Sequence, residues 1–154
     1  MSDWIRRTKE VALEGLLLET TNAIQQHIEQ HNLGPILSDV LMCVHTDSEK
    51  PKKGLFGRAE TVRMAAILTP RWLVWSVEQR NAKPTVASAQ LMHVTIQDYA
   101  QTSFVKLIPD SGIQVTGMFT NAGEGASAFI GLEENLAGNS FKDLVIKTAQ
   151  DAKK

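Results

Sequence analysis

The middle of this 154-residue chain, residues 36–132, constrains the fold more than any other part of the sequence. Short runs of β-branched, aromatic and other apolar residues alternate there with turn-forming residues, which is typical of short strands. The runs are 36–46, 61–69, 71–79, 85–91, 93–99, 104–108, 113–119 and 126–132. Because most connections are too short for a parallel crossover, we predict seven or eight antiparallel strands.

Both flanking segments have the composition and spacing of helices. Residues 1–33 contain one glycine and no proline, and they are rich in good helix formers. Their apolar stripe, at three- and four-residue steps, consists of Leu13, Leu16, Leu17, Thr20, Ile24, Ile28 and His31. We therefore predict one long N-terminal helix that ends at Gly34-Pro35, and a second helix over residues 138–152 with Asn139 or Ser140 as its cap.

A helix, a series of short strands and a final helix form an α+β order within a single domain, residues 1–154. A sheet of many short twisted strands tends to curl and close, because closure removes its exposed edges. We expect a half-closed antiparallel barrel of about seven strands, plugged at one end by the C-terminal helix. Trp72 and Trp75 fall on opposite faces of one strand, so one fills the core and the other needs cover from the N-terminal helix or from another subunit.

The segment AILTPRWLVW, residues 66–75, resembles the hairpin between the second and third strands of bacterial pleckstrin-homology-like domains. In that hairpin an apolar strand ends in Leu-Thr, turns, and resumes with Arg followed by apolar residues. The strand Val94-Thr95-Ile96 and the helix from Ser140 are similar in kind to later elements of the family. The resemblance implies a split barrel capped by the final helix, in a non-enzymatic domain that binds lipid headgroups, peptides or sister subunits. The N-terminal helix is an addition to that module.

Composition excludes several classes of protein and site. The net charge of −1 gives no overall attraction to nucleic acid. The single cysteine, Cys43, rules out an intrachain disulfide and a zinc site built on several thiolates. We find no secretory signal and no apolar run long enough to cross a membrane, so we expect a cytoplasmic protein.

No arrangement of residues indicates catalysis or a bound cofactor. His27 and His31 stand one helical turn apart, but Ile28 occupies the place where metalloproteases carry glutamate, and no third ligand follows nearby. We therefore place both histidines at the border of the helix stripe. A Gly-x-Ser-x-Gly motif is also missing from the sequence, and we expect a protein that is not an enzyme.

The stretch 50–63 is the most informative candidate site. It carries a charge of +4 while the rest of the chain carries −5, and two apolar residues lie between glycines at its centre. The candidate ligand- or membrane-binding residues are Lys50, Lys52, Lys53, Leu55, Phe56, Arg58 and Arg63. Lysines beside an apolar tip are typical of contacts with an anionic membrane surface. In the alternative interpretation, the tip folds back over the barrel and the lysines are only solvated.

Two main functional hypotheses follow, and an enzyme of unknown type is a less favoured third. In the first, the chain is a non-catalytic module for protein binding or self-association, in which the N-terminal helix docks on the barrel or on a partner chain. In the second, it binds anionic membranes or lipid headgroups through the stretch 50–63, where lipid-binding members of the resembled family carry the basic residues of their first inter-strand loop. The spacing of Lys53, Arg58 and Arg63 does not reproduce a strict family motif.

Overall fold

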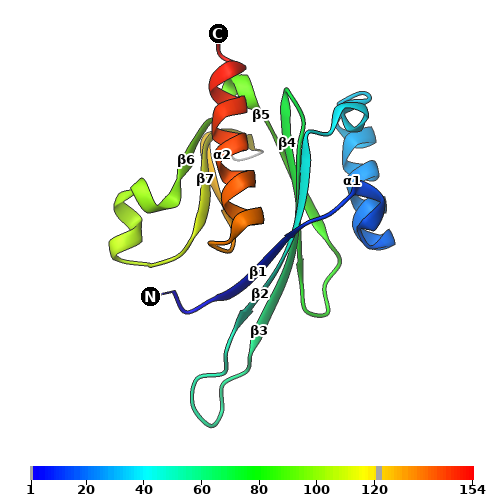
Figure 1. Cartoon of the computed structure of the whole chain (residues 1–154). Helices are drawn as coiled ribbons and strands as arrows, with labels where there is room; N and C mark the ends of the chain where they lie inside the picture. Colours follow the sequence, from blue (N-terminus) through cyan, green and yellow to red (C-terminus); the bar gives the residue numbers. More distant parts are fainter. Residues whose placement is uncertain (1, 121–122) are drawn as a thin grey trace.

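The computed structural model describes residues 2–120 and 123–154, and its strands pair in two antiparallel sheets (Figure 1). One sheet has the order β1-β2-β3-β4-β5 and the other β6-β7-β8. The elements are β1 (Ile5–Glu10), α1 (Leu18–Gln30), β2 (Met42–Lys50), β3 (Glu60–Leu68), β4 (Trp72–Gln79), β5 (Thr85–Gln90), β6 (Thr95–Asp98), β7 (Gly112–Thr120), β8 (Gly123–Gly131) and α2 (Leu136–Asp151). Short 3-10 helices fill several of the connections.

The α+β class and the antiparallel pairing are confirmed, whereas no closed barrel forms within the described residues. A 3-10 turn at Leu91–His93 separates β5 from β6, which pairs with β7 in the other sheet. At the other edge of the five-stranded sheet, β1 contacts the second half of the chain through side-chain hydrogen bonds and not through strand pairing. Thr8 donates its backbone N–H to Glu133 Oε1 (3.0 Å), and its carbonyl accepts from Asn135 Nδ2 (2.9 Å).

The main core lies between the two sheets and α2. Figure 1 shows α2 standing beside the five-stranded sheet with β6 and β7 on its other side. Phe141, Val145 and Ala149, at four-residue steps along α2, are all buried there against side chains of both sheets. Trp75 lies in the same core.

A second, smaller core covers the opposite face of the five-stranded sheet. Ile24 and Ile28 of α1 pack there on Ile67 and Val74, with Trp72 at the margin. The predicted placement of Trp72 and Trp75 on opposite faces is therefore confirmed, as is the N-terminal helix as the cover of one face.

The extent of the N-terminal helix was predicted wrongly, because residues 5–10 form β1. This strand pairs antiparallel with β2 from Ile5↔Glu49 to Glu10↔Val44, and the helix begins only at Leu18. Helix propensity is weak beside tertiary pairing. Thr8 is buried and its hydroxyl shares a hydrogen bond with that of Thr46 (2.8 Å), an interaction that a period-two register provides and a helix would lose.

Four other local predictions differ from the structure. The run 104–108 begins in a 3-10 helix, Ser103–Lys106, rather than a strand, and residues 36–39 are also 3-10. Strand β2 continues to Lys50, which shortens the predicted loop to residues 51–59. The cap of α2 is Asn135, whose side chain accepts a hydrogen bond from Gly138 N (2.8 Å).

Candidate functional site

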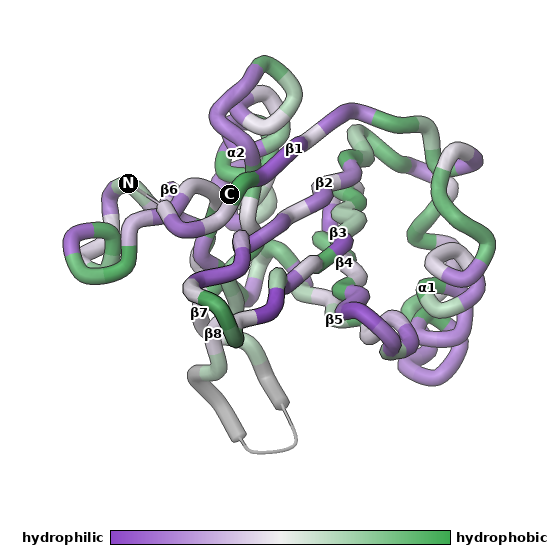
Figure 2. Tube along the Cα trace, turned by 90° about the horizontal axis from the view of Figure 1, so that it is seen from below, coloured by the Kyte–Doolittle hydropathy of each residue, from purple (hydrophilic) through white to green (hydrophobic). Residues whose placement is uncertain are grey.

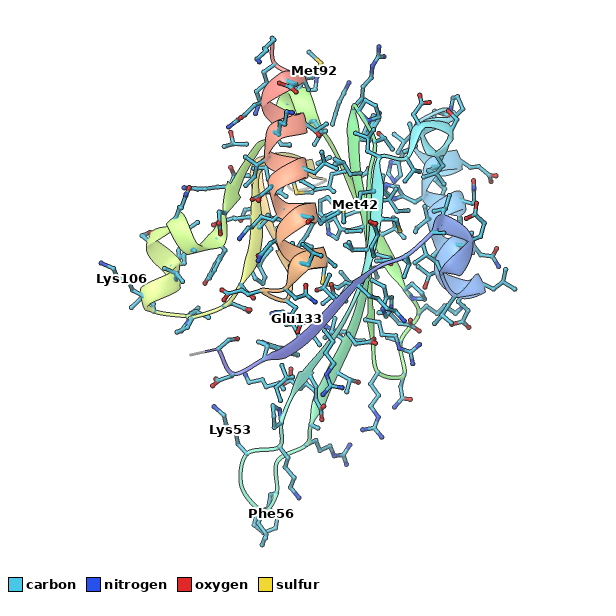
Figure 3. The ribbon with its side chains drawn as sticks, in the orientation of Figure 1. Met42, Lys53, Phe56, Met92, Lys106 and Glu133 are labelled. Carbon is cyan, nitrogen blue, oxygen red and sulfur yellow. The ribbon has the colours of Figure 1, made fainter. Side chains whose placement is uncertain are left out.

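The loop 51–59 extends beyond the body of the molecule at the end of the β2–β3 hairpin (Figures 1 and 3). The two strands pair without a break up to Lys50↔Glu60, so the hairpin is a regular ladder to the base of the loop. Because the ladder continues into the five-stranded sheet, the sheet holds the loop away from the two cores.

The tip of the loop exposes its two apolar side chains. Leu55 is 82% and Phe56 95% exposed, and Figure 3 shows Phe56 at the far end of the hairpin. Gly54 has φ +74°, and a Cβ on Gly57 would overlap the carbonyl oxygen of Lys53. The glycines thus permit a turn that directs Leu55 and Phe56 outward, and the alternative in which these residues fold back over the sheet is not what the structure shows.

Cations surround this apolar tip. Lys52, Lys53 and Arg58 are exposed in the loop. Lys53 Nζ lies 3.2 Å from Asp3 Oδ2, with both side chains more than half exposed, so solvent screens the pair and the lysine is available to other anions. At the base, Lys50 Nζ is 6.0 Å from the centroid of the Trp4 ring.

Arg63 does not belong to this cluster. It lies in β3, and the strand register places it opposite two acidic residues, Asp47 of β2 and Glu78 of β4. Its face of the sheet carries a groove of about 550 Å³, also lined by Arg7 and Lys9. Six of the seven predicted residues therefore gather at the hairpin end, and Arg63 is separated from them.

Trp4 is the neighbour of the site that sequence reasoning missed, and a buried ion pair positions it. Arg6 donates to both carboxylate oxygens of Asp110 (2.8 and 2.6 Å) and to Ser48 Oγ (2.7 Å). The side chains of Arg6 and Asp110 are only 10% and 9% exposed. The guanidinium carbon also lies 5.2 Å from the Trp4 ring centroid, which fixes the N-terminal segment beside the hairpin. The signal that the sequence offered for this neighbour was the position of Trp4, an aromatic residue directly before the basic strand β1.

The described residues contain no group of three or more His, Cys, Asp or Glu side chains that could hold a metal ion. His27 Nε2 shares a hydrogen bond with Ser88 Oγ (2.8 Å), and the His27 and His31 rings lie 4.4 Å apart. Burial, followed by repulsion from His31, lowers the pKa of His27. Burial raises the pKa of Cys43 to about 12, so this thiol is protonated at neutral pH and is a poor nucleophile.

Comparisons of the chain with known protein families, curated proteins and solved structures found no match. Among the described residues, no helix is both long and apolar enough to cross a bilayer.

Proposed function

We propose that this chain is a non-catalytic binding module that attaches to anionic membrane surfaces through the loop 51–59. The observation that carries the proposal is the exposure of Leu55 and Phe56 at the tip of a hairpin whose flanks carry Lys52, Lys53 and Arg58. Water is a poor environment for such a tip, while the boundary between headgroups and acyl chains accommodates both parts of it.

Two contributions of similar size support the attachment. Full burial of a leucine or phenylalanine side chain is worth about 1.5–3 kcal/mol. Each lysine or arginine close to an acidic membrane adds ~1 kcal/mol, and three lie in the loop. Neither contribution alone anchors a protein stably, but an apolar insertion combined with a basic patch does.

We further propose a pleckstrin-homology-like architecture for residues 42–151. In support, strands β2–β5 form one antiparallel arrangement in sequence order, β6–β8 form the second, and α2 fills the space between them. The loop between the first two of these strands is the one that carries basic residues in lipid-binding members of that family. In this comparison, β1 and α1 are additions.

One argument for self-association does not hold, because the apolar stripe of α1 packs within the chain itself. Ile24 and Ile28 are 1% and 8% exposed against the molecule's own sheet. The helix therefore does not offer this stripe to a partner, and membrane binding is the hypothesis that the geometry favours.

Vesicle sedimentation tests the proposal. We expect the protein to sediment with vesicles of phosphatidylcholine and phosphatidylglycerol at low salt and to be released as salt rises. It should not sediment with vesicles of pure phosphatidylcholine. K52Q/K53Q should weaken binding about 30-fold, the equivalent of ~1 kcal/mol for each lysine.

A matched variant controls for net charge. K153Q/K154Q removes the same two charges from exposed residues beyond α2, at the far end of the molecule from the hairpin (Figure 1), and should bind as the wild type does. The proposal fails if the wild-type protein does not bind acidic vesicles at low salt, or if K153Q/K154Q weakens binding as much as K52Q/K53Q.

A further inference from the structure

A second apolar protrusion lies in the connection between β6 and β7. Phe104, Leu107 and Ile108 are 51%, 82% and 67% exposed, and Lys106 stands among them. Figure 1 shows this connection as a loop standing away from the sheets, and Figure 2 shows an apolar stretch at its outer edge. A protein rarely presents several large apolar side chains side by side without a binding role.

The protrusion is an ordered turn rather than a loose loop. Tyr99 is buried, packs edge-on against Phe129 (4.8 Å between ring centroids), and donates its hydroxyl to the carbonyl of Ile108 (2.6 Å). The backbone N–H groups of Leu107 and Ile108 both donate to the carbonyl of Phe104 (3.0 and 2.8 Å). These contacts fix the turn from inside, so the apolar side chains of residues 104, 107 and 108 are held outward.

The N-terminal segment connects this protrusion to the basic hairpin. Asp3 contacts Lys53 of the hairpin loop, and Trp4 lies beside Lys50. Trp4 also lines a small cavity of about 390 Å³ together with Val105 and Pro109 of the β6–β7 connection. In Figure 1 the segment that leads into β1 also lies between the two protrusions, so all three parts share one side of the molecule.

The charges around this cavity are largely satisfied within the protein. Asp110 is paired with Arg6, and Glu133 accepts the N–H of Thr8, while Glu134 is exposed. Figure 3 shows Lys106 on the β6–β7 connection and Lys53 on the hairpin loop, so each protrusion carries a cation. Tryptophan is enriched at the level of the headgroups in membrane proteins, where its ring meets both apolar and polar surroundings.

We propose that residues 103–108 form a second membrane contact, in which Phe104, Leu107 and Ile108 enter the same bilayer surface as Leu55 and Phe56. This inference rests on the proposed function and names the orientation of the bound domain. Two insertion points with Trp4 between them fix the tilt of the molecule, whereas one insertion point alone would not. The far end of α2 and the exposed side of α1 then face away from the membrane.

Site-directed labelling tests the orientation in the intact chain. Cys43 is 3% exposed and its thiol is protonated at neutral pH, so it does not compete for the label. An environment-sensitive fluorophore is attached to L55C, L107C or Q150C, the last on the exposed face of α2. On vesicles of phosphatidylcholine and phosphatidylglycerol, we expect blue-shifted emission and quenching by nitroxide-labelled lipid at residues 55 and 107, and neither effect at 150.

The outcomes separate the two proposals. A response at residue 55 without one at residue 107 overturns the second contact and leaves the hairpin proposal standing, and the apolar protrusion would then belong to a protein interface. A lack of response at both residues, with the protein in the soluble fraction, overturns both proposals.

A binding measurement gives an independent readout. L107S should weaken sedimentation with acidic vesicles about tenfold, since a leucine leaves the bilayer boundary. L18S removes a similarly exposed leucine (75%) from α1, which faces away, and should have no effect. Leu107 makes little contact with the core, so L107S should keep the wild-type circular dichroism and melting temperature. Equal binding by L107S and wild type would contradict the inference.

Discussion

Removing one partner of the Arg6–Asp110 pair should destabilise the protein strongly. The pair joins β1 to the segment before β7 through two hydrogen bonds between charged groups, and both side chains are about nine-tenths buried. In D110A the guanidinium keeps Ser48 but loses its counter-charge in a poorly solvated position. Loss of one member of a buried ion pair costs about 3–5 kcal/mol, so we expect a decrease in the free energy of unfolding within that range.

Urea denaturation of a double-mutant cycle measures this coupling. R6M leaves Asp110 with the N–H of Ser111 as a remaining donor (2.8 Å), so its cost should fall near the lower end of the range. R6M/D110A removes both charges and should cost less than the sum of the single variants, with a coupling energy of about 2 kcal/mol or more. Additive effects, or a cost below about 1 kcal/mol for D110A, would refute the description of the pair as buried and mutually dependent.

Three further predictions concern the cores and the strand ends. F141A should lower the free energy of unfolding by about 3–5 kcal/mol in urea titrations, because the ring is fully buried between the two sheets. The lowered pKa of His27 means that folding favours its neutral form, so stability should decrease as pH falls below 6.5; H27N should show a smaller decrease, and an unchanged pH profile would count against this assignment. G131A should lower the melting temperature, because a Cβ there would overlap the Arg6 guanidinium; a wild-type melting temperature would show that Arg6 has room to move.

The sequence identified strands that carry an apolar face and failed where a strand has none. Strands β3 and β4 were recognisable as nearly continuous apolar runs because both of their faces are buried, and the hairpin β7–β8 also follows the predicted runs closely. Strand β1 was missed because its sequence, IRRTKE, has no apolar face. Its stability comes from Thr46, Asp110 and Glu133, which are distant in sequence, and no local pattern reports such contacts.

The run FVKLI, residues 104–108, failed for the opposite reason. Its apolar content is typical of a buried strand, yet three of its side chains are exposed, on a 3-10 helix and the turn that follows it. Hydrophobic composition alone does not distinguish an apolar side chain buried in the core from one exposed on the surface. The half-closed barrel was expected from the number of short strands, from the tendency of such a sheet to remove its edges and from the family resemblance. Whether sheets close depends on registers that the sequence does not display.

The sequence predicted the charge and the glycines of the candidate site, but it did not predict which residues surround the site. The loop 51–59 was recognisable because Leu55 and Phe56 interrupt a basic stretch. The position of Arg63 opposite Asp47 and Glu78 depends on the pairing register of three strands. Trp4 could be placed only once β1 was known.

The side-chain hydrogen bonds at Thr8 bear on how copies of this protein could aggregate. Glu133 and Asn135 occupy the outward-facing amide and carbonyl at the middle of β1, so an incoming strand would find those groups already engaged. Filaments that grow by sheet extension need two receptive borders on every molecule. Because the β1 edge is obstructed, two copies could pair their five-stranded sheets only through β5. Edge-to-edge pairing would then stop at a dimer, which protects the protein from open-ended polymerisation through this sheet.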